Sequence, residues 1–198
     1  MRDKKPLPWL EADYSLCLAS ASPRRLELLR QVGIEPFIYP TKVDETVLKK
    51  ETPKLYAKRM AITKAKAGLQ SGYKNILGAD TVVVLNGKIL GKPKDEQDAI
   101  NMLTRLSGQK HHVLTAIAMI LQNSSTIHSR TVKSDVWFKK NTEAEIAAYV
   151  ATQEPFDKAG SYAIQGVGSF MVEKIAGSYS GVVGLPLFET LQLLINSN

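Results

Sequence analysis

Segments patterned like β-strands alternate along the chain with segments patterned like helices, and this alternation constrains the fold more than any other feature of the sequence. The apolar run at residues 15–20 leads into an amphipathic segment at 23–32, and the pattern then repeats. Such an alternation predicts an α/β fold. Asn86-Gly87 separates the apolar runs 82–85 and 88–90, which is the strongest short-range signal for a β-hairpin. A sheet that combines hairpins with crossover helices is mixed rather than purely parallel.

Start and stop signals place the remaining helices. Pro53 follows Thr52 as the first helical residue, and Thr142 and Glu145 have the spacing of a capping box. The predicted helices after the first one lie in segments 52–72, 93–108, 142–152 and 185–197, and within 93–108 the helix is started by Asp95 and stopped by Gly108. Two long strands, at 111–121 and 126–138, are expected to pair around a turn at 123–125.

Length and composition are those of an ordinary globular protein. The chain has 198 residues, of which 44% are hydrophobic and 23% charged, enough for one domain or two small lobes. Its single cysteine, Cys17, excludes a disulfide within the chain. The beginning of the chain lacks the apolar core of a signal peptide, and the longest apolar run, at 113–121, falls short of the ~20 residues of a membrane span. We therefore expect a cytoplasmic protein without a membrane partner.

Two arginines occupy an unusual place in the stretch "SASPRRLELL". Ser22 is a suitable N-cap and Pro23 a suitable first helical residue, yet Arg24 and Arg25 follow. The first turn of a helix favours an acidic residue by about 0.3–1 kcal/mol. A phosphate bound to the free N–H groups would explain the arginines, whereas arginines extended into water would need no ligand. The net charge of +7 also favours an anionic partner.

Carboxylates occur where apolar strands are expected to end. Asp80 interrupts the apolar stretch "NILGADTVVV", where an ionised group is costly unless it is paired or binds a metal. The structural alternative is that Asp80 caps a turn or pairs with a neighbouring lysine. Residues 36–46 are predicted to form a strand followed by a loop that carries Glu45, and Asp157 lies in a glycine-rich segment; simple solvation is the alternative for both. Together these oxygen ligands suit Mg²⁺ or Mn²⁺.

Cationic and amide side chains complete the inventory. Lys64 and Lys92 join the two arginines as groups that suit a polyphosphate, and the amide of Gln165 could read the edge of a base. The sequence contains no complete P-loop, no complete dinucleotide fingerprint and no cluster of Cys and His for zinc. The dispersed lysines do not resemble the basic and aromatic pattern of a nucleic-acid interface.

Several separate motifs, in order, make the chain resemble the Maf family, the septum-formation-inhibitor-like nucleoside triphosphate pyrophosphatases. These motifs are "LASASPRRLELL" at 18–29, "VDE" at 43–45, "ITKAKA" at 62–67, "GADTVV" at 78–83, "GKP" at 91–93, "LSGQKHHVLTAIA" at 106–118, "FDKAGSYAIQG" at 156–166 and "GSYSGVVGLPL" at 177–187.

The resemblance implies an elongated mixed β-sheet flanked by helices, with a deep cleft between two lobes, similar to inosine triphosphate pyrophosphatases. It implies a single domain over residues 15–198, preceded by an extension at 1–14 outside the family pattern. The implied reaction is metal-dependent hydrolysis between the α- and β-phosphates of a nucleoside triphosphate, giving a monophosphate and pyrophosphate. The "DKAGSYAIQG" form resembles the subgroup that acts on dTTP and UTP, and modified pyrimidine nucleotides are further candidate substrates.

The resemblance also implies roles for single residues. Asp80 is the expected proton acceptor, and Arg24, Thr81 and Gln165 are associated with the choice of substrate. With the charged inventory above, the expected catalytic residues are Asp80, Glu45, Lys64 and Lys92. The expected substrate-binding residues are Ser20, Ser22, Arg24, Arg25, Thr81, Asp157 and Gln165, and the expected ligands of the divalent cation are Glu45, Asp80 and Asp157.

A nucleoside triphosphate is therefore the expected small-molecule partner, with no nucleic acid, and the family resemblance implies a homodimer. Two enzymatic alternatives remain open at this stage, a pyrophosphatase for 7-methyl-GTP and one for purine nucleotides. The alternative from another class is a non-catalytic nucleotide-binding regulator of cell division.

Overall fold

The computed structural model describes residues 15–122 and 126–195. The extension expected at 1–14 and the turn expected at 123–125 lie outside these residues. The strands are β1 (Leu16–Leu18), β2 (Phe37–Ile38), β3 (Asn75–Leu85), β4 (Lys88–Leu90), β5 (Lys110–Ile120), β6 (His128–Phe138) and β7 (Val172–Ala176). The α-helices are α1 (Pro23–Gln31), α2 (Pro53–Gly68), α3 (Glu96–Leu106), α4 (Glu143–Ala151), α5 (Tyr179–Val183) and α6 (Leu187–Ile195). Short 3₁₀ helices are η1 (Leu69–Ser71), η2 (Glu154–Asp157), η3 (Ala159–Ser161) and η4 (Val167–Met171).

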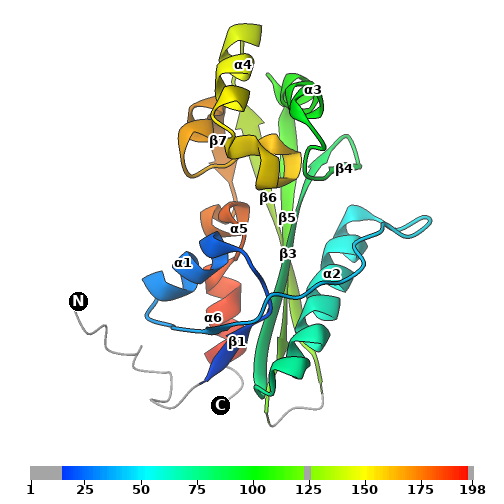
Figure 1. Ribbon diagram of the computed structural model, residues 1–198, viewed down its shortest axis with the longest axis vertical. Helices are drawn as coiled ribbons and strands as arrows, with labels where there is room; N and C mark the ends of the chain where they lie inside the picture. Colours follow the sequence, from blue (N-terminus) through cyan, green and yellow to red (C-terminus); the bar gives the residue numbers. More distant parts are fainter. Residues whose placement is uncertain (1–14, 123–125, 196–198) are drawn as a thin grey trace. The chain divides into compact units, whose positions relative to one another are not determined.

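The strands form one seven-stranded sheet in the order β2-β1-β3-β5-β6-β7, with β4 paired to β3 (Figure 1). Strand β1 pairs in parallel with β2 and β3, whereas β4 is antiparallel to β3 and β7 is antiparallel to β6. The sheet is therefore mixed and flanked by helices, which confirms the predicted α/β class. Strand β7 has no counterpart among the predicted elements, because it lies in the glycine-rich segment where no regular pattern is visible.

The turn and the helix caps predicted from short sequence patterns are present in the structure. Asn86 and Gly87 both have positive φ, 50° and 76°, as the tight turn between β3 and β4 requires. The side chains of Thr52 and Asp95 each accept a hydrogen bond from the backbone N–H three residues further on, and Thr142 forms the predicted capping box with Glu145. These caps confirm the predicted beginnings of α2, α3 and α4.

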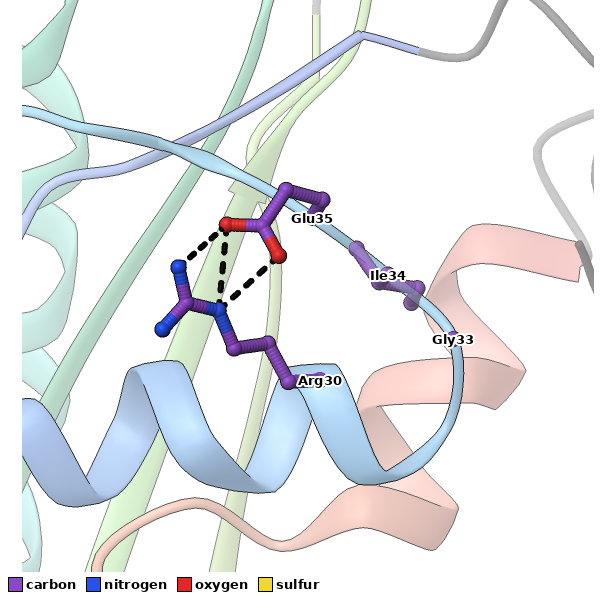
Figure 2. Close-up of a pocket in the computed structure, with 4 residues that line it drawn as sticks. All are labelled: Arg30, Gly33, Ile34 and Glu35. Carbon is purple, nitrogen blue, oxygen red and sulfur yellow. Dashed lines mark hydrogen bonds and ion pairs between the residues drawn. The ribbon is translucent and has the colours of Figure 1, made fainter. Parts of the chain in front are cut away.

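Helix α1 ends in a charged turn that Figure 2 shows in detail. The guanidinium of Arg30 donates to the carboxylate of Glu35 from Nε, at 2.9 and 3.0 Å, and from Nη2, at 2.6 Å. Both side chains are exposed, so solvent screens the ion pair and its contribution to stability is small. The pair bridges the turn in which the chain passes from α1 through Gly33, whose φ is +79°, towards β2.

Backbone contacts divide the described chain into two compact units. The first comprises the described residues up to Asp80, residues 115–131 and those from Gly184 onwards; the second comprises residues 81–114 and 132–183. The division falls within β3, β5 and β6. Within residues 15–122 and 126–195, no helix combines the length and the apolar character that crossing a membrane requires.

Helix α2 packs tightly against the strands of the first unit. A Cβ atom at Gly78 of β3 would lie 2.3 Å from the carbonyl oxygen of Ala61 and 2.5 Å from the backbone nitrogen of Ala65, so the helix backbone nearly touches the strand backbone. Ala61 and Ala65 are fully buried there. This contact matters for function, because α2 also carries Lys64 and β3 carries Asp80.

The second unit has its own hydrophobic core. Buried side chains from α3, α4 and the local strands form it, among them Leu103, Phe138 and Tyr149. The same unit contains the glycine-rich segment that follows η2. The core includes Tyr162 and Met171 from that segment, and their close packing helps to hold its loops in one conformation.

Candidate functional site

Asp80 ends the first of the three segments that make up the first unit and lies within β3, where only 6% of its surface is exposed. Burial raises the pKa of its carboxyl above the ordinary value, although the nearby Lys64 and Arg25 cations oppose the shift. A carboxylate that is poorly solvated holds a proton more readily than one in water. Asp80 therefore has the properties of a proton acceptor.

Lys64 of α2 joins two carboxylates. Its Nζ donates to Oδ1 of Asp80 at 2.7 Å and lies 2.7 Å from Oε1 of Glu45. The side chains of Lys64 and Asp80 are largely buried, whereas that of Glu45 is 55% exposed. The structure therefore brings together the three expected catalytic residues of this unit, and a cation lies between the two carboxylates.

The loop that carries Glu45 is fixed by helix α2. The hydroxyl of Tyr56 donates to the backbone carbonyl of Glu45 at 2.9 Å, and Arg59 donates to the backbone carbonyl of Thr46 at 2.9 Å. Arg59 also makes a bidentate pair with Glu51, at 2.6 and 2.7 Å, and its guanidinium lowers the pKa of Glu51 to about 2. Burial, together with the nearby Asp80 and Glu45, raises the pKa of Tyr56 to about 12, so its hydroxyl stays a donor at neutral pH.

The arginines at the start of α1 have different surroundings. Arg25 donates from Nε to the carbonyl of Gly184 at 2.9 Å and from Nη1 to Oγ of Ser20 at 2.9 Å. Burial lowers the pKa of Arg25, while Asp80 and Glu45 act in the opposite direction. Arg25 is thus held in place near the Asp80 carboxylate, and the positive charge of the nearby Arg24 also lowers the pKa of Arg25.

Ser20 and Ser22 meet at the same helix start, with the backbone N–H of Ser22 donating to Oγ of Ser20 at 3.2 Å. Ser22 occupies the predicted N-cap position, but its side chain accepts no capping hydrogen bond. The predicted N-cap position of Ser22 is therefore confirmed, with extended backbone at Ser22 and Pro23 in the first turn, although no side-chain hydrogen bond closes the cap. Ser20 itself is 6% exposed.

The other expected site residues belong to the second unit. Lys92 is exposed after β4, and its neighbour Gly91 accepts a hydrogen bond from the backbone of Gly160 at 2.9 Å, so the Lys92 loop lies against the segment that follows Asp157. The carboxylate of Asp157 pairs with Lys158. Thr81 and Gln165 are half-buried.

A divalent cation fits the carboxylates of the first unit in part. Mg²⁺ in nucleotide enzymes is usually held by one or two carboxylates together with substrate phosphates and water. Glu45 and Asp80 supply two carboxylates that converge on one positive charge, that of Lys64. Throughout the part of the chain that the structure describes, three or more His, Cys, Asp or Glu side chains never come together as a complete metal site. The protein groups alone therefore supply a partial ligand set.

Tyr56 and Arg59 are site residues that the sequence analysis missed. Both donate to backbone carbonyls of the Glu45 loop. Because every residue has a backbone carbonyl, such contacts require no particular residue type in the loop and produce no sequence motif. One signal was available: Tyr56 precedes Lys64 by about two helical turns, which places both on one face of α2.

We expect Tyr56→Phe to lower kcat/KM about fivefold while the protein stays folded. The substitution removes the hydrogen bond from the Tyr56 hydroxyl to the backbone carbonyl of Glu45, which is worth about 0.5–1.5 kcal/mol. The ring of residue 56, where Tyr56 is 7% exposed, keeps its packing. Steady-state kinetics and thermal unfolding check this. Tyr73→Phe, in which the changed ring stacks on Phe37, is the matched control, and equal effects of both variants would contradict the positioning role.

The chain is similar to several known proteins. A dTTP/UTP pyrophosphatase of Pseudoalteromonas atlantica is 51% identical over 184 residues, covering 90% of this chain and 95% of the relative. A dTTP/UTP pyrophosphatase of Escherichia coli K12 is 50% identical over 186 residues, covering 93% of each chain. A solved structure of a HAM1 protein from Coxiella burnetii is 18% identical with a TM-score of 0.47, covering 64% of this chain and 74% of that one.

The family described as Maf-like protein matches residues 15–197, which is almost the whole chain. That match covers both units and all of the expected site residues. The chain belongs to the Maf-like protein family.

Proposed function

We propose that this chain hydrolyses dTTP and UTP to the corresponding monophosphate and pyrophosphate. The observation that carries the proposal is the ion-pair cluster in which Lys64 lies 2.7 Å from both the buried Asp80 and Glu45. This cluster occurs in a chain about half identical to relatives named dTTP/UTP pyrophosphatase. A buried base beside fixed cations is suited to attack by water on a phosphoryl group.

Asp80 accepts the proton of the attacking water in this mechanism. Its burial raises the pKa of the carboxyl, and a general base works best when its pKa approaches the working pH. Lys64 donates to the same carboxylate, which keeps Asp80 ionised and directs its remaining lone pairs. As Asp80 takes the proton, the water oxygen bonds to the attacked phosphorus and the bond from that phosphorus to the oxygen bridging the α- and β-phosphates breaks, so that the monophosphate and pyrophosphate separate.

Cationic side chains stabilise the charge that develops on the phosphates. Arg25 is fixed by Ser20 and by the carbonyl of Gly184, so little reorganisation is needed when negative charge appears. Arg24 at the same helix start and the lysines Lys64 and Lys92 add positive charge. Ser20, Ser22, Thr81, Asp157 and Gln165 keep the substrate-binding roles that the resemblance implies.

A divalent cation, Mg²⁺ or Mn²⁺, is part of the proposal. Glu45 and Asp80 would hold it, with Asp157 as the third proposed ligand. When bound, such an ion supplies positive charge that polarises the phosphoryl group. Lys64 would then keep the two carboxylates in place. The nucleoside triphosphate substrate also favours a cytoplasmic location.

A panel of nucleoside triphosphates tests the proposed function. The purified chain is assayed with UTP, dTTP, CTP, ATP, GTP and 7-methyl-GTP, with Mg²⁺ or Mn²⁺ and again after chelation. We expect the highest kcat/KM for dTTP and UTP and loss of turnover with chelator. A preference for 7-methyl-GTP or for purines would favour the other enzymatic assignments, and tight binding without turnover of any nucleotide would favour a regulator.

A further inference from the structure

A short loop of the second unit is held at both of its ends by one pair of side chains. The hydroxyl of Tyr149, on α4, accepts a hydrogen bond from the backbone N–H of Ala163 at 3.2 Å and donates to Oε1 of Glu154 at 2.8 Å. Glu154, the first residue of η2, accepts from the N–H of Val167 on Oε2 and from the N–H of Gly168 on Oε1, both at 3.0 Å. The two side chains therefore span residues 163–168, and we call them the Tyr149–Glu154 clamp.

Two glycines allow the clamp to approach the backbone so closely. A Cβ atom at Gly166 would lie 2.5 Å from Oε2 of Glu154, and Gly166 has a φ of +101°, which favours glycine. A Cβ atom at Gly168 would lie 2.6 Å from the hydroxyl oxygen of Tyr149. The glycines thus serve a specific contact, in which a carboxylate binds the backbone directly.

The chemistry of Glu154 suits this contact. Burial raises the pKa of Glu154, but the hydrogen bonds from Gly168, Tyr149 and Val167 outweigh burial and lower the pKa below the ordinary value. Glu154 is therefore ionised at neutral pH, and both of its oxygens accept. A glutamine at this place has only one acceptor oxygen, so its NH₂ group would face a backbone N–H.

Gln165 is the central residue of the three between the clamped Ala163 and Val167, and it is half-buried. Its backbone is fixed on one side through Ala163 and on the other through Val167 and Gly168. A side chain whose position is set before the base arrives needs no further ordering on binding, so more of its hydrogen-bond energy is left to discriminate between bases. The clamp provides that fixed position.

We propose that Glu154 is a positioning residue for substrate selection, which fixes the loop that presents Gln165 to the base of the nucleotide. The proposal deepens the function proposed above and rests on it. Glu154 does not touch the reacting atoms in this account. Tyr149 fixes the other end of the loop, because its hydroxyl binds both Glu154 and the backbone N–H of Ala163.

A double-mutant cycle on Glu154 and Gln165 tests the proposal. The kcat/KM ratio for UTP over CTP is measured for the wild type, Glu154→Gln, Gln165→Ala and the double variant. We expect each single variant to lower the ratio about tenfold, the equivalent of one lost hydrogen bond, and the double variant to lower it no further than Gln165→Ala alone. Glu143→Gln, at an exposed position in the first turn of α4, is the control and should match the wild type.

Three results would overturn the positioning role. The first is an equal loss of kcat/KM for UTP and CTP in Glu154→Gln, as a merely structural defect would give. The second is a double variant whose selectivity loss is the product of the two single losses. The third is an unchanged UTP:CTP ratio in Gln165→Ala. If Glu154→Gln does not fold, Tyr149→Phe takes its place in the cycle, because it removes the hydroxyl but keeps the buried ring.

Hydrogen exchange separates failure of the clamp from failure of the proposed function. In Glu154→Gln, the amides of residues 163–168 should exchange at least about tenfold faster than in the wild type, without a similar change in β3 or α2. Unchanged exchange would overturn the clamp, whatever the substrate. A wild-type enzyme that does not hydrolyse UTP would instead contradict the proposed function, and with it the role of the clamp in selection.

Discussion

Replacing Asp80 with asparagine is expected to lower kcat for UTP about a thousandfold, because a positioned general base contributes about 10²–10⁴-fold to a rate. Asparagine has nearly the same shape as aspartate, so the packing of this residue, which is 6% exposed, is kept. Lys64 keeps its second carboxylate partner, Glu45, at 2.7 Å. The variant should therefore remain folded while its turnover is lost.

Steady-state assays and thermal unfolding together check the Asp80 prediction. Glu27→Gln on α1 makes the same change from carboxylate to amide at an exposed position, and it should retain the activity and melting temperature of the wild type. An Asp80→Asn enzyme with more than about a tenth of the wild-type kcat would remove Asp80 from the role of base.

The second large effect concerns stability, at Gly78. A methyl group there would overlap the carbonyl oxygen of Ala61, 2.3 Å away, and the nitrogen of Ala65, 2.5 Å away. Both are backbone atoms of α2, so no side-chain rotation relieves the overlap. We expect Gly78→Ala to destabilise the fold by about 3 kcal/mol or more, which lowers Tm by about 10 °C in a protein of this size. Activity should fall as well, because α2 carries Lys64.

Gly91→Ala is the matched control for Gly78→Ala. A Cβ atom at Gly91 would meet no heavy atom within 4 Å, and its φ lies outside the positive range that favours glycine. Denaturant unfolding should show a loss of stability for Gly78→Ala alone. If Gly78→Ala unfolded at the same denaturant concentration as the wild type, the close approach of α2 to β3 would be wrong.

Local signals made much of the fold predictable from the sequence. The caps at Thr52, Asp95 and Thr142 mark helix starts because a side-chain acceptor satisfies a nearby N–H. The turn at Asn86-Gly87 marks a hairpin because both residues adopt positive φ. Strand β7 was not predictable in this way, since its register is set by pairing with β6, far away in the sequence.

Some residues of the candidate site were likewise predictable from local sequence, and others were not. Asp80 stood out because an acid in an apolar strand needs a compensating partner, and the structure supplies Lys64, 16 residues away in the sequence. Tyr56 and Glu154 did not stand out, because both act on backbone groups of other segments. Such contacts depend on tertiary packing and carry no residue pattern. The sequence therefore indicates the groups that take part in the chemistry more readily than the groups that position them.

The central claim is that the chain cleaves a pyrimidine nucleoside triphosphate between its α- and β-phosphates, and product analysis on UTP tests it most directly. Chromatography of the nucleotides, with phosphate and pyrophosphate measured separately, should find one UMP and one pyrophosphate for each UTP consumed. Release of UDP with orthophosphate would contradict the account.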